Sequence, residues 1–382
     1  MFVFLVLFWP AYNKGQKSKS NARVEFIDGV ECIHNTGTPL HPDKTVTFVK
    51  DLSIGEENEA GNVILLKPRL ALVDNNENIY FIELLDQDIK VFNSDGMYIK
   101  IIGAKGSGPG EFQNIGSLAI TEDGTLLVMD QTLRRTSLFD TSGQFLRSFQ
   151  WRASCFSLII VKKSSYIVSA IDYSNYGPFG ELFIKEVDFN GNEIRFPGIF
   201  SAPVGKILRD GKYSHFIIPP VIIMSGFVGD PNRGIFYHCV NDKYIIEVYN
   251  TSGKLLKKTD RPYKPVPFNE NDAQEYRAKY GNLGSEFIKK AVEEMDMPKV
   301  KSIVEGMYTD DEGKLWIKTN EKQEDNKKSL TAFDVFDSDG NYFAKVWLAD
   351  IPLIFKKGKM YRMDTDQETG YQSLKRYKVI WK

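Results

Sequence analysis

Short strands of alternating apolar and polar residues recur along the chain, and many end at a turn that opens with Asn or Asp and closes with Gly. Five strands followed by such a turn span 89–92, 137–139, 184–187, 246–249 and 333–336. Their turns are Asn93–Gly96, Asp140–Gly143, Asp188–Gly191, Asn250–Gly253 and Asp337–Gly340. Alternation with a period of two is typical of strands, and Asx and Gly residues close turns that lead straight into another strand. The pattern therefore predicts a repeated antiparallel unit.

A second family of turns stands upstream of these and completes the unit. Its members, at 74–78, 121–124, 310–313 and 357–358, each lead into an apolar strand, and Gly234 does so without an acidic turn. Four strands in each unit, at spacings of about 40 to 50 residues, are typical of a β-propeller blade. We count six blades, at about 64–103, 115–150, 151–198, 216–262, 301–348 and 349–382, the third being the most degenerate. The predicted fold class is all-β, a six-bladed β-propeller with four-stranded antiparallel blades.

The sixth unit ends after its third strand, at 375–381, so its fourth strand must come from elsewhere in the chain. The segment Val46–Gly55 resembles the fourth strand of another blade, Tyr98–Gly103. We therefore predict that an N-terminal strand completes the C-terminal blade, which would leave no open sheet edge there.

We interpret residues 1–22 as a signal-like segment with a polar linker, and 23–382 as a single propeller domain. The apolar run Phe2–Trp9 is far shorter than the roughly 20 residues that span a bilayer, and it suits the apolar region of a signal peptide. It lacks a basic region before it, a clear cleavage site and a lipobox cysteine. We predict export to the periplasm or the cell exterior, with a run that does not span the membrane but could hold the N-terminus there before cleavage. The alternative is a buried strand of the mature protein.

Composition narrows the function classes. Lys plus Arg (49) nearly balances Asp plus Glu (50), so long-range attraction to nucleic acid is weak, and we predict no nucleic-acid partner. The cysteines Cys32, Cys155 and Cys239 lie far apart, which supports neither a disulfide framework nor a zinc site. We expect them to be buried as small apolar residues, with a Cys155–Cys239 bridge left open.

One segment carries a family resemblance. Residues 106–112 (GSGPGEF), followed by Asp123-Gly124, 127–130, Arg135 and 138–140, closely resemble an NHL repeat. Segments 263–268, 311–317 and 376–379 look like bacterial six-bladed propeller proteins without an assigned function. The resemblance implies the fold and export; it does not imply any particular activity. Only blade two carries the full signature, and Asp88 stands where NHL repeats favour Arg.

Alternating strand direction sorts the loops onto two faces. The short-turn face holds the first-to-second and third-to-fourth turns of each blade, and the long-loop face holds the second-to-third loops and the blade-to-blade connections. The largest long-loop excursion, about 263–300, contains predicted helices at 271–280 and 285–295. Asn269 or Asn271 would cap the first helix, and Gly284-Ser285 the second. Ile288, Ala291, Val292 and Met295 form one apolar stripe. The excursion is either a packed surface element or a lid or docking helix.

The candidate ligand-binding residues all belong to the predicted long-loop face: Lys105, Asp130, Gln131, Arg134, Arg135 and His238. The NHL resemblance implies that Arg135 pairs with an acidic neighbour, here Asp130, while Arg134 is free to meet an anion with help from Lys105. His238 is placed at the end of a second strand, where a structural role competes with ligand binding. Exposed aromatic residues, Tyr173, Tyr176, Phe179 and Tyr263, are expected among the same loops.

No catalytic, metal or cofactor motif is present in the sequence. The four histidines lack metal-ligand spacing, and neither a GxSxG elbow nor a nucleotide-binding fingerprint occurs. The sequence therefore favours a non-catalytic recognition scaffold for a protein, peptide or glycan. The alternative is a metal-dependent propeller hydrolase or lyase whose ligands converge in the central channel from several blades.

Overall fold

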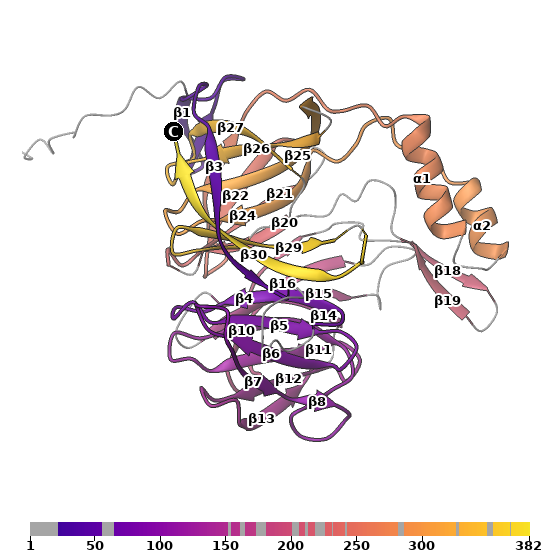
Figure 1. The fold of residues 1–382 in the computed structure, drawn as a ribbon. Coiled ribbons are helices and arrows are strands. Elements are labelled where there is room, and N and C mark those ends of the chain that lie inside the picture. The colour runs from indigo at the N-terminus through magenta and orange to yellow at the C-terminus, as the bar shows by residue number, and fades with distance from the viewer. Residues whose placement is uncertain are drawn as a thin grey trace, which may run out of the picture.

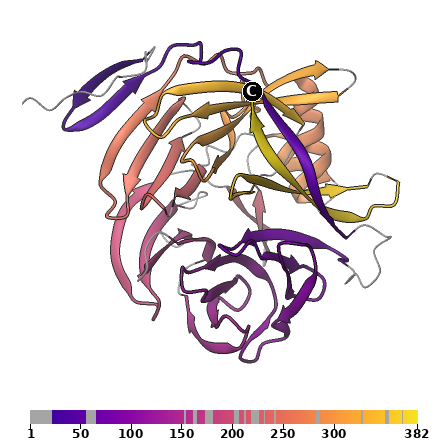
Figure 2. The same cartoon turned by 60° about the vertical axis from the view of Figure 1, so that its left-hand side comes forward.

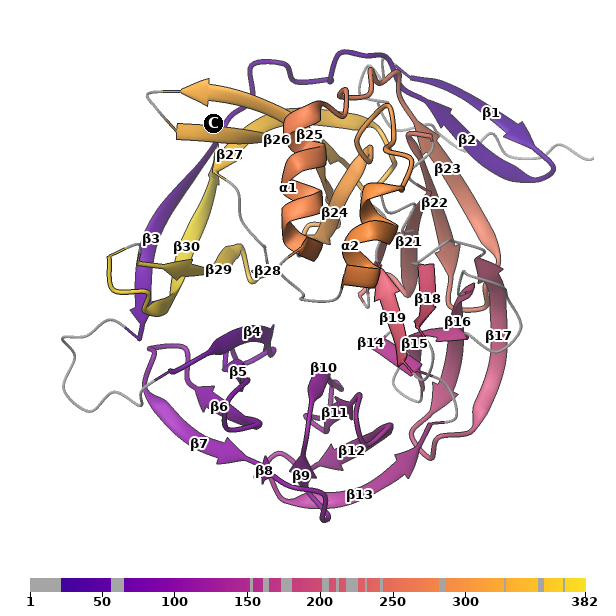
Figure 3. The ribbon, with the colours of Figure 1, turned by 90° about the vertical axis from the view of Figure 1, so that its right-hand side faces the viewer.

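The protein forms a ring of six β-sheets around a central axis, seen along that axis in Figure 3. The computed structural model describes residues 22–55, 65–151, 154–160, 165–172, 181–200, 206–210, 213–217, 226–230, 232–240, 243–281, 286–325, 328–349, 354–366 and 368–382. The predicted run 2–9, the aromatic residues Tyr173, Tyr176 and Phe179, and the cap 284–285 lie outside these residues. Among the described helices, none is long and apolar enough to cross a membrane.

Each blade is a four-stranded antiparallel sheet, as predicted. Blade one comprises β4 (Pro68–Val73), β5 (Ile79–Glu83), β6 (Asp88–Phe92) and β7 (Tyr98–Ile102). Blade two comprises β10 (Ile115–Ile120), β11 (Leu126–Asp130), β12 (Arg135–Phe139) and β13 (Phe145–Gln150). Blade three comprises β14 (Ser154–Ile160), β15 (Ser165–Asp172), β16 (Glu181–Asp188) and β17 (Glu193–Phe200).

The second half of the ring repeats this plan. Blade four comprises β20 (Gly226–Asp230), β21 (Ile235–Val240), β22 (Ile245–Asn250) and β23 (Leu255–Asp260). Blade five comprises β24 (Val304–Thr309), β25 (Leu315–Asp325), β26 (Lys328–Phe336) and β27 (Tyr342–Ala349). Blade six comprises β28 (Ile354–Lys356), β29 (Lys359–Thr365), β30 (Gln372–Trp381) and β3 (Val46–Ile54).

The prediction that an N-terminal strand closes the ring is confirmed. β3 pairs antiparallel with β30 from Val46 opposite Trp381 to Ile54 opposite Leu374. Figure 1 shows the indigo β3 beside the yellow β30. An N-terminal and a C-terminal strand therefore share one sheet, and blade six has four strands.

A hairpin that the sequence analysis did not identify precedes this strand. β1 (Arg23–Ile27) and β2 (Val30–His34) form it, and β2 pairs in parallel with β23, which extends blade four to six strands (Figure 2). Asn35 then fixes the chain between blades four and five: its amide donates to Thr259 Oγ1 at 2.9 Å, and its Oδ1 accepts the N–H of Tyr342 at 2.7 Å. The segment 22–54 thus fastens blades four, five and six from outside, and we call it the N-terminal belt.

The core lies between neighbouring blades and follows from strand alternation. In β5, Phe81 packs against blade six, where Tyr361 and Leu374 belong to the same apolar cluster. Ile82, the next residue, belongs to the cluster that joins blades one and two around Phe112. Because successive side chains of a strand point to opposite faces, one apolar strand serves two interfaces. Each large side chain buried in this way contributes about 1.5–3 kcal/mol.

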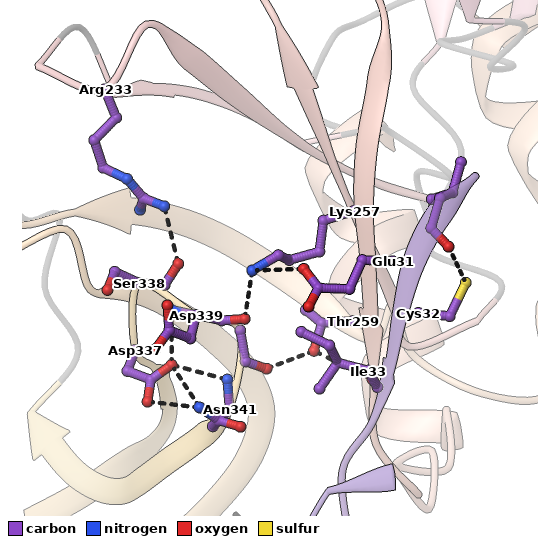
Figure 4. A network of polar contacts seen from close by, with 12 residues as sticks. Glu31, Cys32, Ile33, Arg233, Lys257, Thr259, Asp337, Ser338, Asp339 and Asn341 are labelled. Carbon is purple, nitrogen blue, oxygen red and sulfur yellow. Dashed lines mark hydrogen bonds and ion pairs between the residues drawn. The ribbon is translucent and has the colours of Figure 1, made fainter. Parts of the chain in front are cut away.

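The Asx/Gly turns of the short-turn face connect neighbouring blades. Four residues after the closing Gly of its turn, each of blades one, two and four places a cation on its outer strand, and that cation donates to a turn carbonyl of the next blade. These pairs are Lys100 to Thr141 (2.7 Å), Arg147 to Phe189 (2.6 Å) and Lys257 to Asp339 (2.6 Å). Figure 4 shows the third of them, with Arg233 donating to the Ser338 carbonyl at 2.9 Å nearby. These turns therefore belong to the scaffold, as the sequence indicated.

Two insertions rise from the long-loop face between blades three and five. The first is a hairpin, β18 (Lys206–Asp210) and β19 (Tyr213–Ile217), which the sequence analysis did not predict. The second contains α1 (Glu270–Gly281) and α2 (Glu286–Glu293), close to the predicted ranges. Asn269 and Asp272 cap α1 reciprocally, each backbone N–H donating to the other's side chain at 2.9–3.0 Å. In Figures 1 and 3, α2 lies beside β18 and β19. We call the two insertions together the raised rim.

Candidate functional site

The helical insertion packs on itself. Ile288 and Val292 of α2 are buried against Tyr276 of α1, and Tyr276 donates to Met295 Sδ at 3.5 Å, so the predicted apolar stripe faces the partner helix. Where the insertion leaves the blades, its two ends pair: Phe268 N–H donates to the Lys299 carbonyl at 3.1 Å. The two helices therefore pack on each other, and the two ends of the insertion pair beneath them.

A buried cluster anchors these paired ends to the ring. Arg261 leads from β23 into the insertion, and its guanidinium contacts the Asp334 carboxylate, which also accepts hydrogen bonds from Tyr244 (2.6 Å) and Tyr342 (2.7 Å). Burial alone would lower the pKa of Arg261, but the Asp334 charge raises it, so the arginine stays charged. Tyr263, expected to be exposed, is half-buried, with its ring 5.3 Å from that of Tyr244 and 5.2 Å from the guanidinium. The cluster holds blades four and five together at the base of the raised rim.

The side chains of Asp130 and Arg135 hold the GSGPGEF crossover and the residues after it by hydrogen bonds to their backbone groups. Asp130 is buried, and its Oδ2 accepts the N–H groups of Gln113 (2.6 Å) and Asn114 (3.1 Å). The Arg135 guanidinium donates to the carbonyls of Ser107 (3.1 Å), Gly108 (2.6 Å) and Glu111 (2.7 Å). The expected Arg135–Asp130 pairing is therefore replaced by two separate clamps, because each charged group finds backbone partners in the crossover.

The neighbouring residues Gln131 and Arg134 are exposed at the loop between β11 and β12. Arg134 has a positive φ of 50°, and its carbonyl accepts the Trp151 N–H at 2.7 Å, so its backbone is fixed while its side chain extends from the loop. Gln131 Oε1 accepts from Asn114 Nδ2 at 3.4 Å, and its side chain covers Gly116. Arg69 of blade one donates to the Gly116 carbonyl at 2.9 Å. Arg69, Asn114, Gln131 and Arg134 form a polar blade-two patch on the long-loop face.

The remaining two predicted residues are Lys105 and His238. Lys105 is exposed on β8 (Ala104–Lys105), which pairs with β9 (Glu111–Phe112) inside the crossover. His238 lies inside β21 rather than at its end, because that strand continues to Val240. It is 2 % exposed, and its Nδ1 lies 3.0 Å from Glu247 Oε2 across the sheet. This hydrogen bond is the main cause that lowers the pKa of Glu247 to about 2. His238 therefore belongs to the interior of blade four.

A pocket in blade six was not identified from the sequence. A cavity of about 270 Å³ opens where the second-to-third loop of the blade, 366–371, meets the end of β3. Its polar lining includes Asp364, Asp366, Tyr371, Ser373 and Lys375. Second-to-third loops and strand-four ends lie on the long-loop face, so this blade-six pocket and the blade-two patch share that face. No linear motif could reveal it, since β3 and β29 are far apart in the sequence.

The described cysteines and acidic residues do not suggest a metal centre. Cys32 and Cys239 are buried, as expected, and the side chain of Cys155 lies outside the described residues. Within the described part of the chain, no group of three or more His, Cys, Asp and Glu side chains could hold a metal ion.

Comparison with known proteins agrees with this architecture. Residues 62–197 match the model of a family, DUF5128, described as a 6-bladed beta-propeller. A protein classed as exported from Bacteroides fragilis superposes with a TM-score of 0.52 at 11% identity, covering 92% of this chain and 99% of its own. A DUF4221 family member from Bacteroides vulgatus superposes with a TM-score of 0.55 at 11% identity, covering 88% and 98%. A search of curated proteins found no significant match. The chain is therefore a six-bladed β-propeller, and its NHL character stays a prediction.

Proposed function

We propose that this protein is a non-catalytic recognition scaffold that binds a protein, peptide or glycan on its long-loop face. The observation that supports this most is the contrast between the two faces. On the short-turn face, the turn carbonyls of blades two, three and five accept hydrogen bonds from the preceding blade. The raised rim, the blade-two patch and the blade-six pocket all belong to the other face. Binding residues of many proteins lie on loops that a rigid scaffold holds in place, as the long-loop face is held by the ring here.

We also propose that the protein acts outside the cytoplasm. The apolar run Phe2–Trp9 supports this, since its length suits a signal peptide. Fractionation of the producing cells, followed by N-terminal sequencing of the mature protein, tests the proposal. Recovery of the full-length chain in the cytoplasmic fraction alone would contradict it.

A thermal-shift screen tests the recognition function. Purified protein is melted in EDTA, then with Ca²⁺, Zn²⁺ or Mn²⁺, and then with panels of soluble glycans and peptides. A ligand at one hundred times its dissociation constant adds about 2.7 kcal/mol, which raises Tm by a few degrees. We expect glycan or peptide ligands to shift Tm and metals not to. Metal-dependent turnover of an ester or lactone that EDTA abolishes would overturn the proposal.

Two charge reversals on opposite faces locate the bound ligand. Arg134→Glu changes the blade-two patch, and Asp95→Lys makes an opposite reversal in an exposed turn of the short-turn face. We expect Arg134→Glu to weaken binding of a peptide or protein ligand and Asp95→Lys to leave it unchanged. The reverse result would place the binding site on the short-turn face.

A further inference from the structure

The blade-six pocket follows from the register of three strands. Asp364 of β29 lies opposite Ser373 of β30, and Gly55 follows Ile54, which pairs with the neighbouring Leu374. Asp364, Ser373 and Gly55 therefore form one row across the sheet, with side chains on one face. Ser373 is small and Gly55 has no side chain, so the middle of the row is hollow. A Cβ at Gly55 would lie 3.1 Å from the Gln372 carbonyl, and the φ of Gly55 is +92°, so this position strongly favours glycine.

The next row on the same face, Arg362 and Lys375, supplies the positive charges beside the pocket. Arg362 pairs with Lys375 across the two strands, and its Nη2 donates to Asp364 at 2.6 Å and 2.8 Å. This ion pair neutralises the Asp364 carboxylate and fixes its orientation. On the other strand, Lys375 Nζ donates to Ser53 Oγ at 2.9 Å, which directs the ammonium along the pocket wall.

The loop that covers the row adds hydroxyl groups and an aromatic ring. Asp366 Oδ1 accepts the N–H and the hydroxyl of Thr369 at 2.7 Å and 2.9 Å, and these bonds lower the pKa of Asp366. The turn therefore holds its own shape without a ligand. Tyr371 is 53 % exposed beside it, so its ring is available to a bound molecule.

This combination of groups selects the chemical class of the ligand. A divalent cation would meet the Lys375 ammonium and only two carboxylates, one already paired with Arg362. A phosphate would meet those same carboxylates, and an apolar molecule would leave a polar wall unsatisfied. A neutral molecule with several adjacent hydroxyls satisfies carboxylate acceptors, an ammonium donor and hydroxyls together. A volume of about 270 Å³ lies just below the roughly 300–1,000 Å³ of typical ligand pockets, so it suits a ligand of one ring.

We propose that the blade-six pocket binds one neutral sugar ring, with its apolar side on Tyr371 and its hydroxyls toward Asp364, Ser373 and Lys375. The inference rests on the proposed function, since it names the ligand class and the subsite on the long-loop face. An aromatic side chain with one polar end suits a ligand that has both an apolar side and a polar rim.

Saturation-transfer NMR on the full chain tests the proposal. The probes are D-glucose, D-galactose, D-mannose and N-acetylglucosamine, with sodium phosphate, L-glutamate and Ca²⁺ as competitors. A single ring is expected to bind with a Kd of about 1 mM, given the usual affinity of each non-hydrogen atom. We expect at least one sugar to give ring-proton signals that the competitors leave unchanged.

Matched variants distinguish this pocket from other surfaces. Tyr371→Ala changes an exposed side chain and should preserve folding, and Asp364→Asn removes the paired carboxylate. We expect each to weaken sugar binding at least about tenfold. Tyr98→Ala, at a 38 % exposed tyrosine on the outer strand of blade one, and Asp95→Asn should leave it unchanged.

Each outcome decides between the two proposals. If no sugar binds, if a competitor binds in its place, or if both pocket variants bind sugar normally, the inference is overturned. Peptide or protein binding that remains sensitive to Arg134→Glu would then preserve the proposed recognition function. If neither sugars nor peptides and proteins bind, both the inference and the proposed recognition function are overturned.

Discussion

The ammonium of Lys257 lies 2.6 Å from the carbonyl oxygen of Asp339 and joins the outer strand of blade four to a turn of blade five. The same ammonium lies 3.3 Å from Glu31 Oε2 of the N-terminal belt, so one side chain connects three segments (Figure 4).

Loss of this connection should weaken the blade four–five interface. We expect Lys257→Ala to lower the free energy of unfolding by about 1 kcal/mol, since the Asp339 carbonyl and the Glu31 carboxylate lose a charged donor at the surface. Urea unfolding checks this value. Lys254→Ala, at an exposed residue of the turn that precedes β23, should stay within about 0.5 kcal/mol of the wild type. Equal effects of the two substitutions would contradict the role of Lys257.

Adjacent arginines provide a test of the crossover clamp. Arg135→Ala removes donors from three carbonyls and should cost about 2–3 kcal/mol, whereas Arg134→Ala should be nearly neutral. Urea unfolding measures both, and hydrogen exchange should show faster exchange at 106–112 in Arg135→Ala alone. A costly Arg134→Ala with a neutral Arg135→Ala would refute this assignment.

A substitution at Gly103 tests the close packing of the backbone there against the Phe112 side chain. Its φ is +76°, and a Cβ would stand 2.2 Å from the buried Phe112 ring. We expect Gly103→Ala to cost about 2–5 kcal/mol, from the left-handed backbone together with the overpacking. Gly29→Ala has a similar φ of +79° but open space around it, and should cost only about 1–2 kcal/mol. Thermal melts of both variants compare them; a similar loss would show that the ring imposes no barrier.

Glu247 should make stability depend on pH in the acidic range. Its pKa in the fold is about 2, below the value of 4.5 for a free glutamate, so its contribution is present above pH 4.5 and is lost as the pH falls toward 2. We expect up to about 3 kcal/mol at neutral pH. Urea unfolding of Glu247→Gln from pH 7 to pH 2.5 should approach the wild-type curve as the pH falls. Glu324→Gln, at an exposed position, should run parallel to the wild type throughout; a constant gap for Glu247→Gln would disprove the linkage.

Much of the ring could be predicted because its turns are local. Asn250–Gly253 and Asp337–Gly340 report the position of the last two strands of a blade directly, since Asx capping and positive φ depend on neighbouring residues. The closing strand Val46–Ile54 could be found because it resembles the other outer strands. The belt hairpin carried a signal that was overlooked: Asp28 and Gly29 both have positive φ, at 50° and 79°, as Asp-Gly does in a tight hairpin.

The candidate site was harder because its contacts are distant in sequence. Arg135 has an acidic residue opposite it in the sheet, yet its guanidinium reaches the carbonyls of 107–111, which no residue pattern announces. The sequence predicted His238 at the end of its strand, but the strand continues to Val240, so His238 lies inside it. The blade-six pocket forms because Gly55 and Asp364 lie in one row across the sheet. They do so only because β3 pairs with β30, which the sequence of neither strand shows alone.

That closure also determines when the fold can form. Val46 emerges from any ribosome or translocation pore that delivers the chain from its N-terminus long before its partner Trp381. Until then, β3 has no strand to pair with, although β2 can already pair with β23 of blade four. A product that stops just before β30 therefore leaves β3 without a partner and β29 as an open sheet edge, where another chain can pair with it.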